Sequence, residues 1–340
     1  MHDGLVLRPV SDDDGPQLVD LIGAAYAEYP GCVLDLPDLD ADLPVPATTA
    51  ARRGGRWWVV EDAGRIVASV GTGAPDDGTV ELKRLYVAGS HRRRGLAAAL
   101  VARVEAQASG VGAQTVRLWS DTRFGDAHRL YTAQGYADTG ARRDLHDPSH
   151  TTEIQFSKPV APPTPRREVA WTGPFGPERL RWYDLPDGVV LRGVVAKAPD
   201  GRLAYDVEVD AQWRTRRVQV SDADGVRTLA GDGTGTWWRD GAPADDLTGC
   251  LDVDIESTPA TNTLPIRRVG SGPVTAAWVR VPGPTIEPLH QSYEDHGERR
   301  WTYRSNGGFV GALQVDDDGL VVDYLQQHAD GTTTPIWTRT

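Results

Sequence analysis

The chain has 340 residues, of which 39% are hydrophobic, and it carries a formal net charge of −12 at pH 7. That length favours two domains over one, and an acidic excess in both halves excludes the usual basic nucleic-acid binder. No apolar run approaches the ~20 residues that span a bilayer, and the first residues lack the pattern of a signal peptide. Two cysteines, Cys32 and Cys250, cannot build a disulfide framework. We therefore expect a cytoplasmic protein without a membrane span.

Strand-like and helix-like patterns alternate up to about residue 158. Alternating apolar runs predict strands at 5–9, 56–61, 65–72, 80–87, 115–120 and 152–156. Apolar residues at helical spacing predict helices at 13–29, 95–108 and 126–134. Residues 30–50 are rich in Pro and Asp, and we expect a loop there. The order of these elements predicts an α+β domain over residues 1–158.

Four prolines between Pro159 and Pro165 favour a semi-rigid linker over residues 159–167. Helical periodicity nearly disappears after it. Short apolar runs separated by Gly-containing turns predict strands at 180–183, 188–195, 204–209, 215–220, 226–230, 235–239, 274–281, 299–304 and 320–324. Strands at this spacing are typical of an antiparallel sheet, sandwich or barrel, here over residues 168–340.

A basic run follows the strand that ends near Val87 and leads directly into a helix, as Arg92-Arg93-Arg94-Gly95-Leu96-Ala97. A helix start presents unpaired backbone N–H groups and a positive dipole end to an anion. Small residues at Gly95 and Ala97 allow close approach, and a neighbouring arginine adds charge-assisted hydrogen bonds. Because nearly all basic residues of this chain are Arg, a solvated arginine cluster is an equal alternative.

The run resembles the acetyl-CoA signature of the GNAT family of N-acetyltransferases, R/Q-x-x-G-x-G/A, with Ala97 in place of the commoner Gly. VELKRLYVAGSHRR is similar to the family's central strand, and RLYTAQGY to its late helix and turn. The resemblance covers about residues 4–158. It implies a mixed central sheet flanked by helices, acetyl-CoA as co-substrate, no metal, and a small-molecule amine as acceptor.

The resemblance also implies roles for particular residues. The pantetheine arm would pair with the backbone of Leu85, Tyr86 and Val87. The pyrophosphate would lie on the amides of Arg92, Arg93, Arg94, Gly95, Leu96 and Ala97. Tyr131 would protonate the leaving thiolate, which a phenol of pKa ~10 can do; the alternative is a core aromatic.

Glu81 is our candidate for the base that takes the amine proton, and the alternative is a solvent-facing charge. A strand of period two would place Glu81, Lys83, Leu85 and Val87 on one face. His91 and His128 are further titratable residues, for which we expect structural roles.

The second half contains an unusual segment, residues 235–268, with Cys250, Asp252, Asp254 and the string TPATNTLPIRR. A buried structural thiol and an ion-pair network with Arg267 and Arg268 are the simplest interpretation. The segment also resembles the family described as "Putative glycolipid-binding", over about residues 168–339. That resemblance implies an antiparallel β fold with a curved, partly open sheet or half-barrel. Aromatic and polar residues could then hold an acyl or sugar group, unless they fill the core: Trp213, Trp238, Asp252, Asp254, Asn262, Arg267, Tyr293 and Trp301, with Trp278 and Tyr303.

Together the two resemblances predict an acetyl-CoA-dependent N-acetyltransferase fused to a domain that binds a hydrophobic or glycolipid-like ligand. The alternative is a non-catalytic CoA sensor and lipid-binding protein. An acidic loop with Asp35, Asp38, Asp40 and Asp42 would suit a polycationic acceptor, or it is simply solvated. The sequence identifies neither the acceptor nor the oligomeric state.

Overall fold

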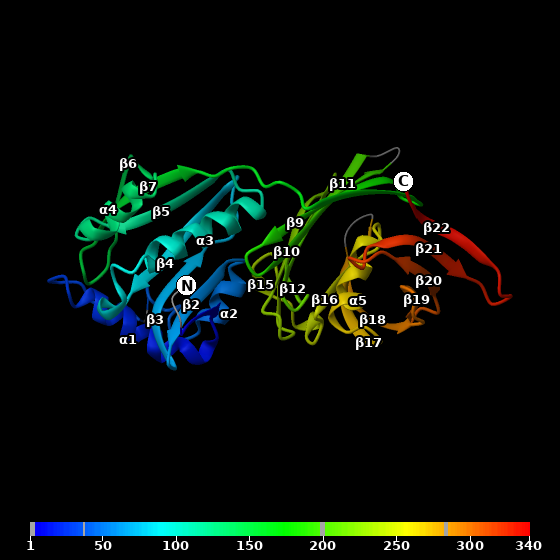
Figure 1. The fold of residues 1–340 in the computed structure, drawn as a ribbon, viewed down its shortest axis with the longest axis horizontal. Coiled ribbons are helices and arrows are strands. Elements are labelled where there is room, and N and C mark those ends of the chain that lie inside the picture. The colour runs from blue at the N-terminus through cyan, green and yellow to red at the C-terminus, as the bar shows by residue number, and fades with distance from the viewer. Residues whose placement is uncertain (1–3, 37, 198–200, 282–284) are drawn as a thin grey trace. The chain divides into compact units, whose positions relative to one another are not determined.

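The computed structural model describes residues 4–36, 38–197, 201–281 and 285–340. Its contacts divide the chain into two compact units, Met1–Pro163 and Thr164–Thr340 (Figure 1). Each unit contains its own sheet and its own hydrophobic core. The units are therefore described separately.

The first unit is built on a seven-stranded mixed sheet. Its strands lie in the order β1 (Leu5–Pro9), β2 (Arg56–Asp62), β3 (Arg65–Thr72), β4 (Thr79–Val87), β5 (Thr115–Asp121), β7 (Thr152–Pro159) and β6 (Ala137–Asp144). Neighbouring strands are antiparallel except β4 and β5, which are parallel. The helices are α1 (Gly15–Tyr26), α2 (Pro46–Arg52), α3 (Leu96–Gly110) and α4 (Gly125–Ala133).

Helices cover both faces of this sheet, and each face has its own core. On one face, α3 buries Leu96, Leu100 and Val104, which share one stripe of the helix because they are spaced by four residues. On the other face, Leu18 and Ile22 of α1 pack in the core that contains Trp57 and Val59 of β2. The predicted fold class, a mixed sheet flanked by helices, is confirmed.

Three local predictions differ from the structure. The first helix ends at Tyr26 and is preceded by a 3-10 turn at Asp12–Asp14. The region predicted to be a loop ends in α2, which begins at Pro46, a residue whose fixed φ suits a first helical turn. Strand β6 escaped prediction because almost all of its side chains are exposed, so its sequence ADTGARRD lacks apolar alternation.

The second unit is a strongly curved sheet of 15 strands (Figure 1). Their order is β15 (Ala242–Pro243), β14 (Trp237–Arg239), β13 (Gly225–Gly231), β12 (Thr215–Asp222), β11 (Gly201–Asp210), β10 (Gly188–Lys197), β9 (Gly176–Leu185), β8 (Arg167–Gly173), β22 (Thr333–Arg339), β21 (Val321–Gln327), β20 (Val310–Val315), β19 (Arg300–Ser305), β18 (Ile286–Asp295), β17 (Gly272–Val279) and β16 (Asp252–Ile255).

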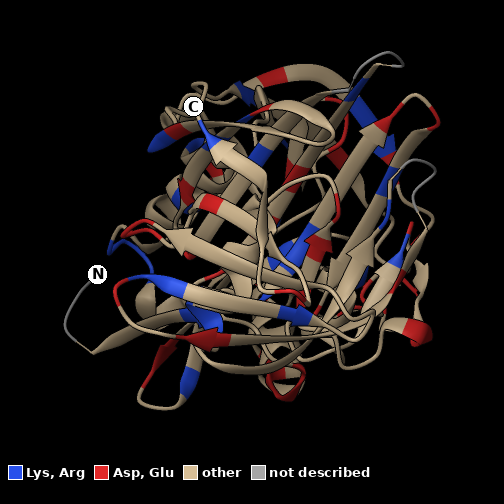
Figure 2. Cartoon of the chain, turned by 90° about the vertical axis from the view of Figure 1, so that its right-hand side faces the viewer, with Lys and Arg blue, Asp and Glu red and all other residues tan. Residues whose placement is uncertain are grey.

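All pairs in this sheet are antiparallel except β16 and β17. Strands β8 and β22 join the two halves of the sheet through two residue pairs, and the end strands β15 and β16 do not pair, so the sheet stays open. The predicted curved, partly open antiparallel sheet is confirmed. Acidic and basic residues are interspersed over its strands (Figure 2), as in the pair Arg192–Asp206 on β10 and β11.

Large aromatic side chains fill the interior of this unit. Trp171, Trp182 and Tyr205 are each no more than 2% exposed. Tyr205 lies across β10 at Gly193, where a Cβ atom would come within 2.1 Å of the tyrosine ring. The string TNTLPIRR contributes a short helix, α5 (Thr263–Arg268), whose Leu264 is fully buried in the same core.

Candidate functional site

Strands β4 and β5 separate part of the way along their length. They pair in parallel only from Thr79–Thr115 to Leu82–Leu118. Beyond this point β4 continues to Val87 along β3, and β5 continues to Asp121 along β7. The β5-facing edge of β4 therefore has no strand partner in the sheet over residues 83–87. A ligand that carries amide groups can pair with such an edge.

A β-bulge at Arg84 lies where the strands separate. Arg84 has a φ of 52°, and the register of β3 with β4 shifts between Ser69 and Gly71. The Ser69 hydroxyl donates to the Arg84 carbonyl at 2.7 Å. A left-handed residue other than glycine is a strained conformation that the surrounding structure has to hold.

The bulge corrects one prediction. Glu81, Lys83, Leu85 and Val87 do not share one face of β4, because the extra residue shifts the alternation by one. Val80 and Leu82 pack in the α3-side core, and after the bulge Leu85 and Val87 pack against that same core. Glu81 and Lys83 therefore point to the opposite face.

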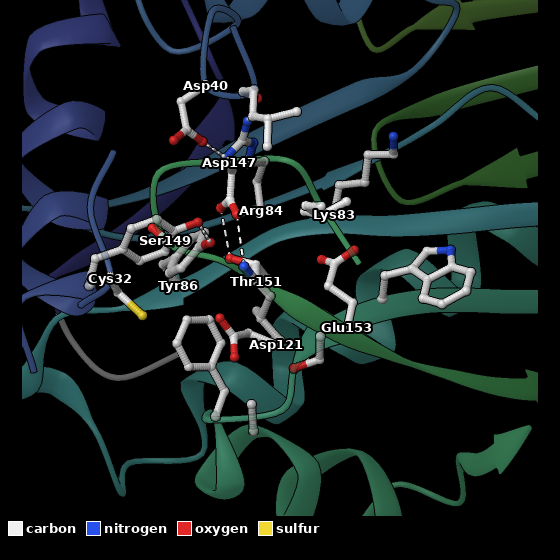
Figure 3. Close-up of a pocket in the computed structure, with 18 of the residues that line it drawn as sticks. Cys32, Asp40, Lys83, Arg84, Tyr86, Asp121, Asp147, Ser149, Thr151 and Glu153 are labelled. Atoms are coloured by element: carbon white, nitrogen blue, oxygen red, sulfur yellow. Dashed lines mark hydrogen bonds and ion pairs between the residues drawn. The ribbon is translucent and has the colours of Figure 1, made fainter. Parts of the chain in front are cut away.

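A cavity of about 400 Å³ opens at this gap (Figure 3). Glu81, Leu85, Tyr86 and Tyr131, all predicted site residues, line it. Two loops complete its wall: residues 27–36 and 38–45 between α1 and α2, hereafter the α1–α2 loop, and residues 145–151 between β6 and β7. The two loops are joined where the Val33 amide donates to the Ser149 hydroxyl oxygen at 2.9 Å.

Arg84 fastens the α1–α2 loop to strand β4. Its guanidinium donates to Asp40 at 2.6 Å, to Asp42 at 2.5 and 3.1 Å, and to the Leu39 carbonyl at 3.1 Å. Burial would lower the pKa of Arg84, but the charges of Asp42 and Asp40 outweigh burial and raise the pKa. The predicted acidic loop is thus partly neutralised by Arg84, a residue that sequence reasoning missed.

Glu81 lies between two cations. Its Oε1 is 3.2 Å from Lys83 Nζ, and its Oε2 is 3.6 Å from Arg117 Nη2. The side chain is one-fifth exposed and borders the cavity. Glu81 is accessible to an amine or to a water molecule in the cavity, although each oxygen also faces a cation.

Tyr131, on α4, packs in the core and also lines the cavity, so its role in proton transfer stays a prediction. Its ring packs near Tyr136 and Phe156, with centroids 5.9 and 5.8 Å away, and it also borders the cavity. Burial raises the pKa of Tyr131, with a smaller contribution from Tyr86. The phenol therefore stays protonated at neutral pH.

The predicted anion-binding loop forms a short 3-10 turn, Gly89–His91, followed by the start of α3 at Leu96. Gly95 is the N-cap residue with a φ of 77°, and no side chain caps the helix. Arg93, Arg94 and Gly95 are exposed. The first turn of α3 therefore follows an exposed segment and has no side-chain cap, two features that an anion site at a helix start requires.

Arg92 differs from the expected geometry. Its guanidinium donates to the Glu28 carboxylate at 2.6 and 2.7 Å and to the Val87 carbonyl at 3.1 Å. The side chain is thus committed to α1 and the end of β4. The Arg92 side chain therefore positions the loop, and contact of the backbone amides with an anion stays a prediction.

The two histidines near the site make local hydrogen bonds. His91 Nε2 lies 3.0 Å from Asp62 Oδ2, and its Nδ1 lies 2.8 Å from the Ser90 hydroxyl. His128 Nε2 lies 2.9 Å from the Asp121 carbonyl. Both arrangements fix loop and helix ends.

In the second unit, the predicted ligand-binding residues are mostly packed inside the protein. Trp238, Tyr293 and Trp301 are at most 8% exposed. Asn262 accepts a hydrogen bond from the Tyr293 hydroxyl at 2.9 Å. Arg267 is exposed, and its guanidinium stacks 4.9 Å from the Trp213 ring.

Of the two predicted acids of this unit, Asp252 is buried and Asp254 is half-buried, and both accept hydrogen bonds. Asp252 accepts two hydrogen bonds from Arg268, and Asp254 accepts from Thr261 and Gln291. Burial raises the pKa of Asp254 to about 6, against these hydrogen bonds. These contacts stabilise the domain. Contact of these residues with a ligand stays a prediction.

Comparison with known proteins supports the two resemblances. Residues 21–136 match the sequence model of the Acetyltransferase (GNAT) family. Residues 169–328 match that of the family described as "Putative glycolipid-binding". The fusion of these two domain types, drawn from the sequence, is thereby confirmed, and the first match indicates an acetyltransferase.

Individual relatives cover parts of the chain. Human "N-acetyltransferase 8" is 37% identical over 95 residues, which are 26% of this chain and 42% of that protein. The chain thus spans less than half of this relative. A DUF1089 family protein from Pseudomonas aeruginosa is 29% identical, covers 43% of this chain and 88% of its own, and has a TM-score of 0.39. A putative acetyltransferase from Salmonella typhimurium with its cofactor acetyl-CoA is 18% identical, covering 47% and 95%, with a TM-score of 0.37.

Among the helices of the described residues, none combines the length and the apolar character needed to cross a bilayer.

Proposed function

We propose that this protein transfers an acetyl group from acetyl-CoA to an amine at the gap between β4 and β5. The observation that carries the proposal is the meeting of three features in one unit. These are an unpaired strand edge at Leu85–Val87, an uncapped and exposed helix start at Gly95, and a cavity lined by a protonated Tyr131. The residues present fit acetyl-CoA, because the edge suits the amides of pantetheine and the helix start suits the diphosphate.

The proposed reaction is a direct attack. The amine nitrogen forms a bond to the thioester carbonyl carbon, and the carbon–sulfur bond breaks. Glu81 takes the proton that the amine loses, directly or through water, and backbone N–H groups near Leu85–Val87 polarise the carbonyl. Tyr131 gives its proton to the departing thiolate. Glu81 then releases its proton to water, and Tyr131 takes a proton back from water. Overall, the amine loses one proton and the CoA thiolate gains one.

The test measures thiol release from acetyl-CoA against a panel of amines. Tyr131→Phe should lower kcat by about a hundredfold, because general acid catalysis typically contributes 10²–10⁴. Acetyl-CoA affinity should stay within about twofold. Tyr136→Phe is the matched control, since Tyr136 packs against Tyr131 but does not border the cavity. Equal turnover in wild type and Tyr131→Phe would remove this role, and binding without any turnover would favour the acetyl-CoA sensor.

We also propose that the second domain binds a hydrophobic or glycolipid-like ligand, and that the protein acts in the cytoplasm. The family match of residues 169–328 supports the first point. Two free, buried cysteines are compatible with the second. Native mass spectrometry of the purified protein should detect a co-purified lipid. A chain that stays ligand-free after incubation with a lipid extract would contradict the binding role.

A further inference from the structure

The α1–α2 loop carries an unusual share of the exposed apolar side chains. Seven large hydrophobic residues are exposed among those that the structure describes, and four of them lie in this loop: Val33 (49%), Leu36 (38%), Leu39 (49%) and Val45 (43%). Val33 and Leu39 also border the cavity. Scattered apolar residues on a surface need no explanation, whereas a group at the edge of a cavity indicates a binding surface.

Polar contacts hold this loop with its apolar side chains outward. Arg84 binds Asp40 and Asp42, and Asp40 also accepts from the Asp35 amide at 2.8 Å. Asp40 is only 4% exposed. The loop thus buries a carboxylate and leaves Val33 and Leu39 half-exposed, the reverse of the usual preference. This arrangement is stable because the carboxylate of Asp40 is paired with Arg84. It leaves Val33 and Leu39 as an apolar edge of the cavity, hereafter the rim.

Behind the rim, the cavity wall is acidic. Seven acidic and four basic side chains line the cavity. Asp147 accepts hydrogen bonds from the amide and hydroxyl of Thr151, at 2.8 and 2.7 Å (Figure 3). These bonds, together with the charge of Arg123, outweigh burial and keep the pKa of Asp147 below its ordinary value. Asp147 therefore stays ionised in the wall, and its direct hydrogen bonds from Thr151 are neutral, so it can attract a cation.

We infer that the acceptor is an amphiphilic amine, with an ammonium head that enters the acidic cavity and an alkyl or acyl tail that lies on the rim formed by Val33 and Leu39. The inference rests on the proposed transfer reaction for the fate of the head group. Carboxylates at the wall bind the ammonium form, which loses one proton to water, and the free amine then attacks the thioester and gives its second proton to Glu81. A hydrophilic polyamine or amino sugar would match the carboxylates but would leave the apolar rim unused.

The first test is a chain-length series on the full-length protein with acetyl-CoA, from butylamine to decylamine below its micelle concentration. Full burial of a methylene group strengthens binding about fourfold, so on a half-exposed rim we expect kcat/KM to rise about twofold per methylene. Leu39→Ser should flatten the series. Val6→Ser, an equally exposed change on β1 that does not border the cavity, should preserve it. A flat wild-type series, or preference for spermidine or glucosamine over decylamine, would overturn the inference.

The second test separates this inference from the proposed function. Decyltrimethylammonium has no N–H group, so it binds without being acetylated. Calorimetry should give decyltrimethylammonium a dissociation constant at least tenfold lower than that of butyltrimethylammonium, both in wild type and in Val6→Ser. In Leu39→Ser the two dissociation constants should be equal. Chain-dependent binding without turnover of any amine would retain the acceptor class and remove the reaction. Turnover with equal affinity for both probes would retain the reaction and remove the acceptor class.

Discussion

Arg84 illustrates how one residue positions the site. It is the bulged residue of β4, and its side chain holds the loop that forms the cavity rim. Its strained φ and its paired charges occur at the same place, where the strands separate. Strain of this kind persists when the surrounding contacts stabilise it.

Removing the Arg84 guanidinium should destabilise the first domain and loosen the rim. Arg84→Met leaves Asp40 and Asp42 without their cation, and breaking a buried ion pair in this way costs about 3–5 kcal/mol. Urea unfolding of the full chain should show that loss of stability. Steady-state kinetics should show a larger rise in the KM for the amine than in the KM for acetyl-CoA. Asp40→Asn, which removes the partner charge, should shift the same two constants in the same direction. A loss of stability below about 1 kcal/mol would show that the ion pairs of Arg84 with Asp40 and Asp42 are not needed to hold the loop.

At the scale of elements, the helix start of α3 and the end of β4 form the two sides of the proposed acetyl-CoA site. Gly95 ends the basic run in a left-handed conformation that an L-residue adopts only with strain. A Cβ atom at Gly95 would meet no atom within 4 Å. The glycine is therefore needed for the backbone path that presents the amides of the first turn.

Gly95→Ala should cost about 1 kcal/mol of stability and weaken acetyl-CoA binding by about tenfold, because the strained residue relaxes and moves the amides. Gly64→Ala is the matched control: Gly64 has a φ of 81° and open space, and it does not border the cavity. The two variants should lose similar stability. Calorimetry should show weaker acetyl-CoA binding in Gly95→Ala and unchanged binding in Gly64→Ala. Equal acetyl-CoA affinity in both would show that Gly95 does not shape the site.

Periodicity and turn residues were sufficient to predict the strongly patterned elements of the first domain. Strand β1 and the hairpin of β2 and β3 follow directly from alternating apolar residues. The bulge could not be predicted, because it depends on how β4 pairs with β3, and sequence alternation continues through it. The anchoring of Asp40 and Asp42 was missed for the same reason: their partner lies more than 40 residues away.

In the second domain, the same reasoning predicted the fold class, and it assigned ligand contacts to residues that the structure buries, among them Trp238 and Trp301. Aromatic residues at Trp238 and Trp301 are equally typical of a binding groove and of a packed interior. Alternating apolar residues along a strand do not show whether the inner face of a curved sheet packs on the core or is open to a ligand. In the structure both side chains are buried, and their contact with a ligand stays a prediction.

At the scale of the whole molecule, two independently packed units each match a different family. The second unit has its own internal electrostatics, centred on a buried carboxyl group. Glu178 on β9 accepts hydrogen bonds from the Tyr205 hydroxyl and from Thr258, the latter at 2.6 Å. Burial raises the pKa of Glu178 to about 7, and these two hydrogen bonds only partly oppose it.

This buried acid predicts a pH dependence of stability. Because its pKa is about 4.5 in a solvated chain and about 7 when folded, the folded state binds more protons between those values. The contribution of Glu178 to stability is therefore full below about pH 4.5 and falls as pH rises to about 7, by about 3 kcal/mol. Urea unfolding of the full chain at pH 5 and 7.5 should show that Glu178→Gln reduces this decline. An unchanged decline would show that Glu178 is not its source.

The most direct test of the central claim follows the acetyl group itself. The full-length protein is incubated with acetyl-CoA and the amine panel, and CoA thiol and N-acetylated amine are quantified together by mass spectrometry. The account predicts equal amounts of the two products at a rate that Tyr131→Phe lowers by about a hundredfold. Acetyl-CoA binding with no acetylated amine from any member of the panel would contradict it.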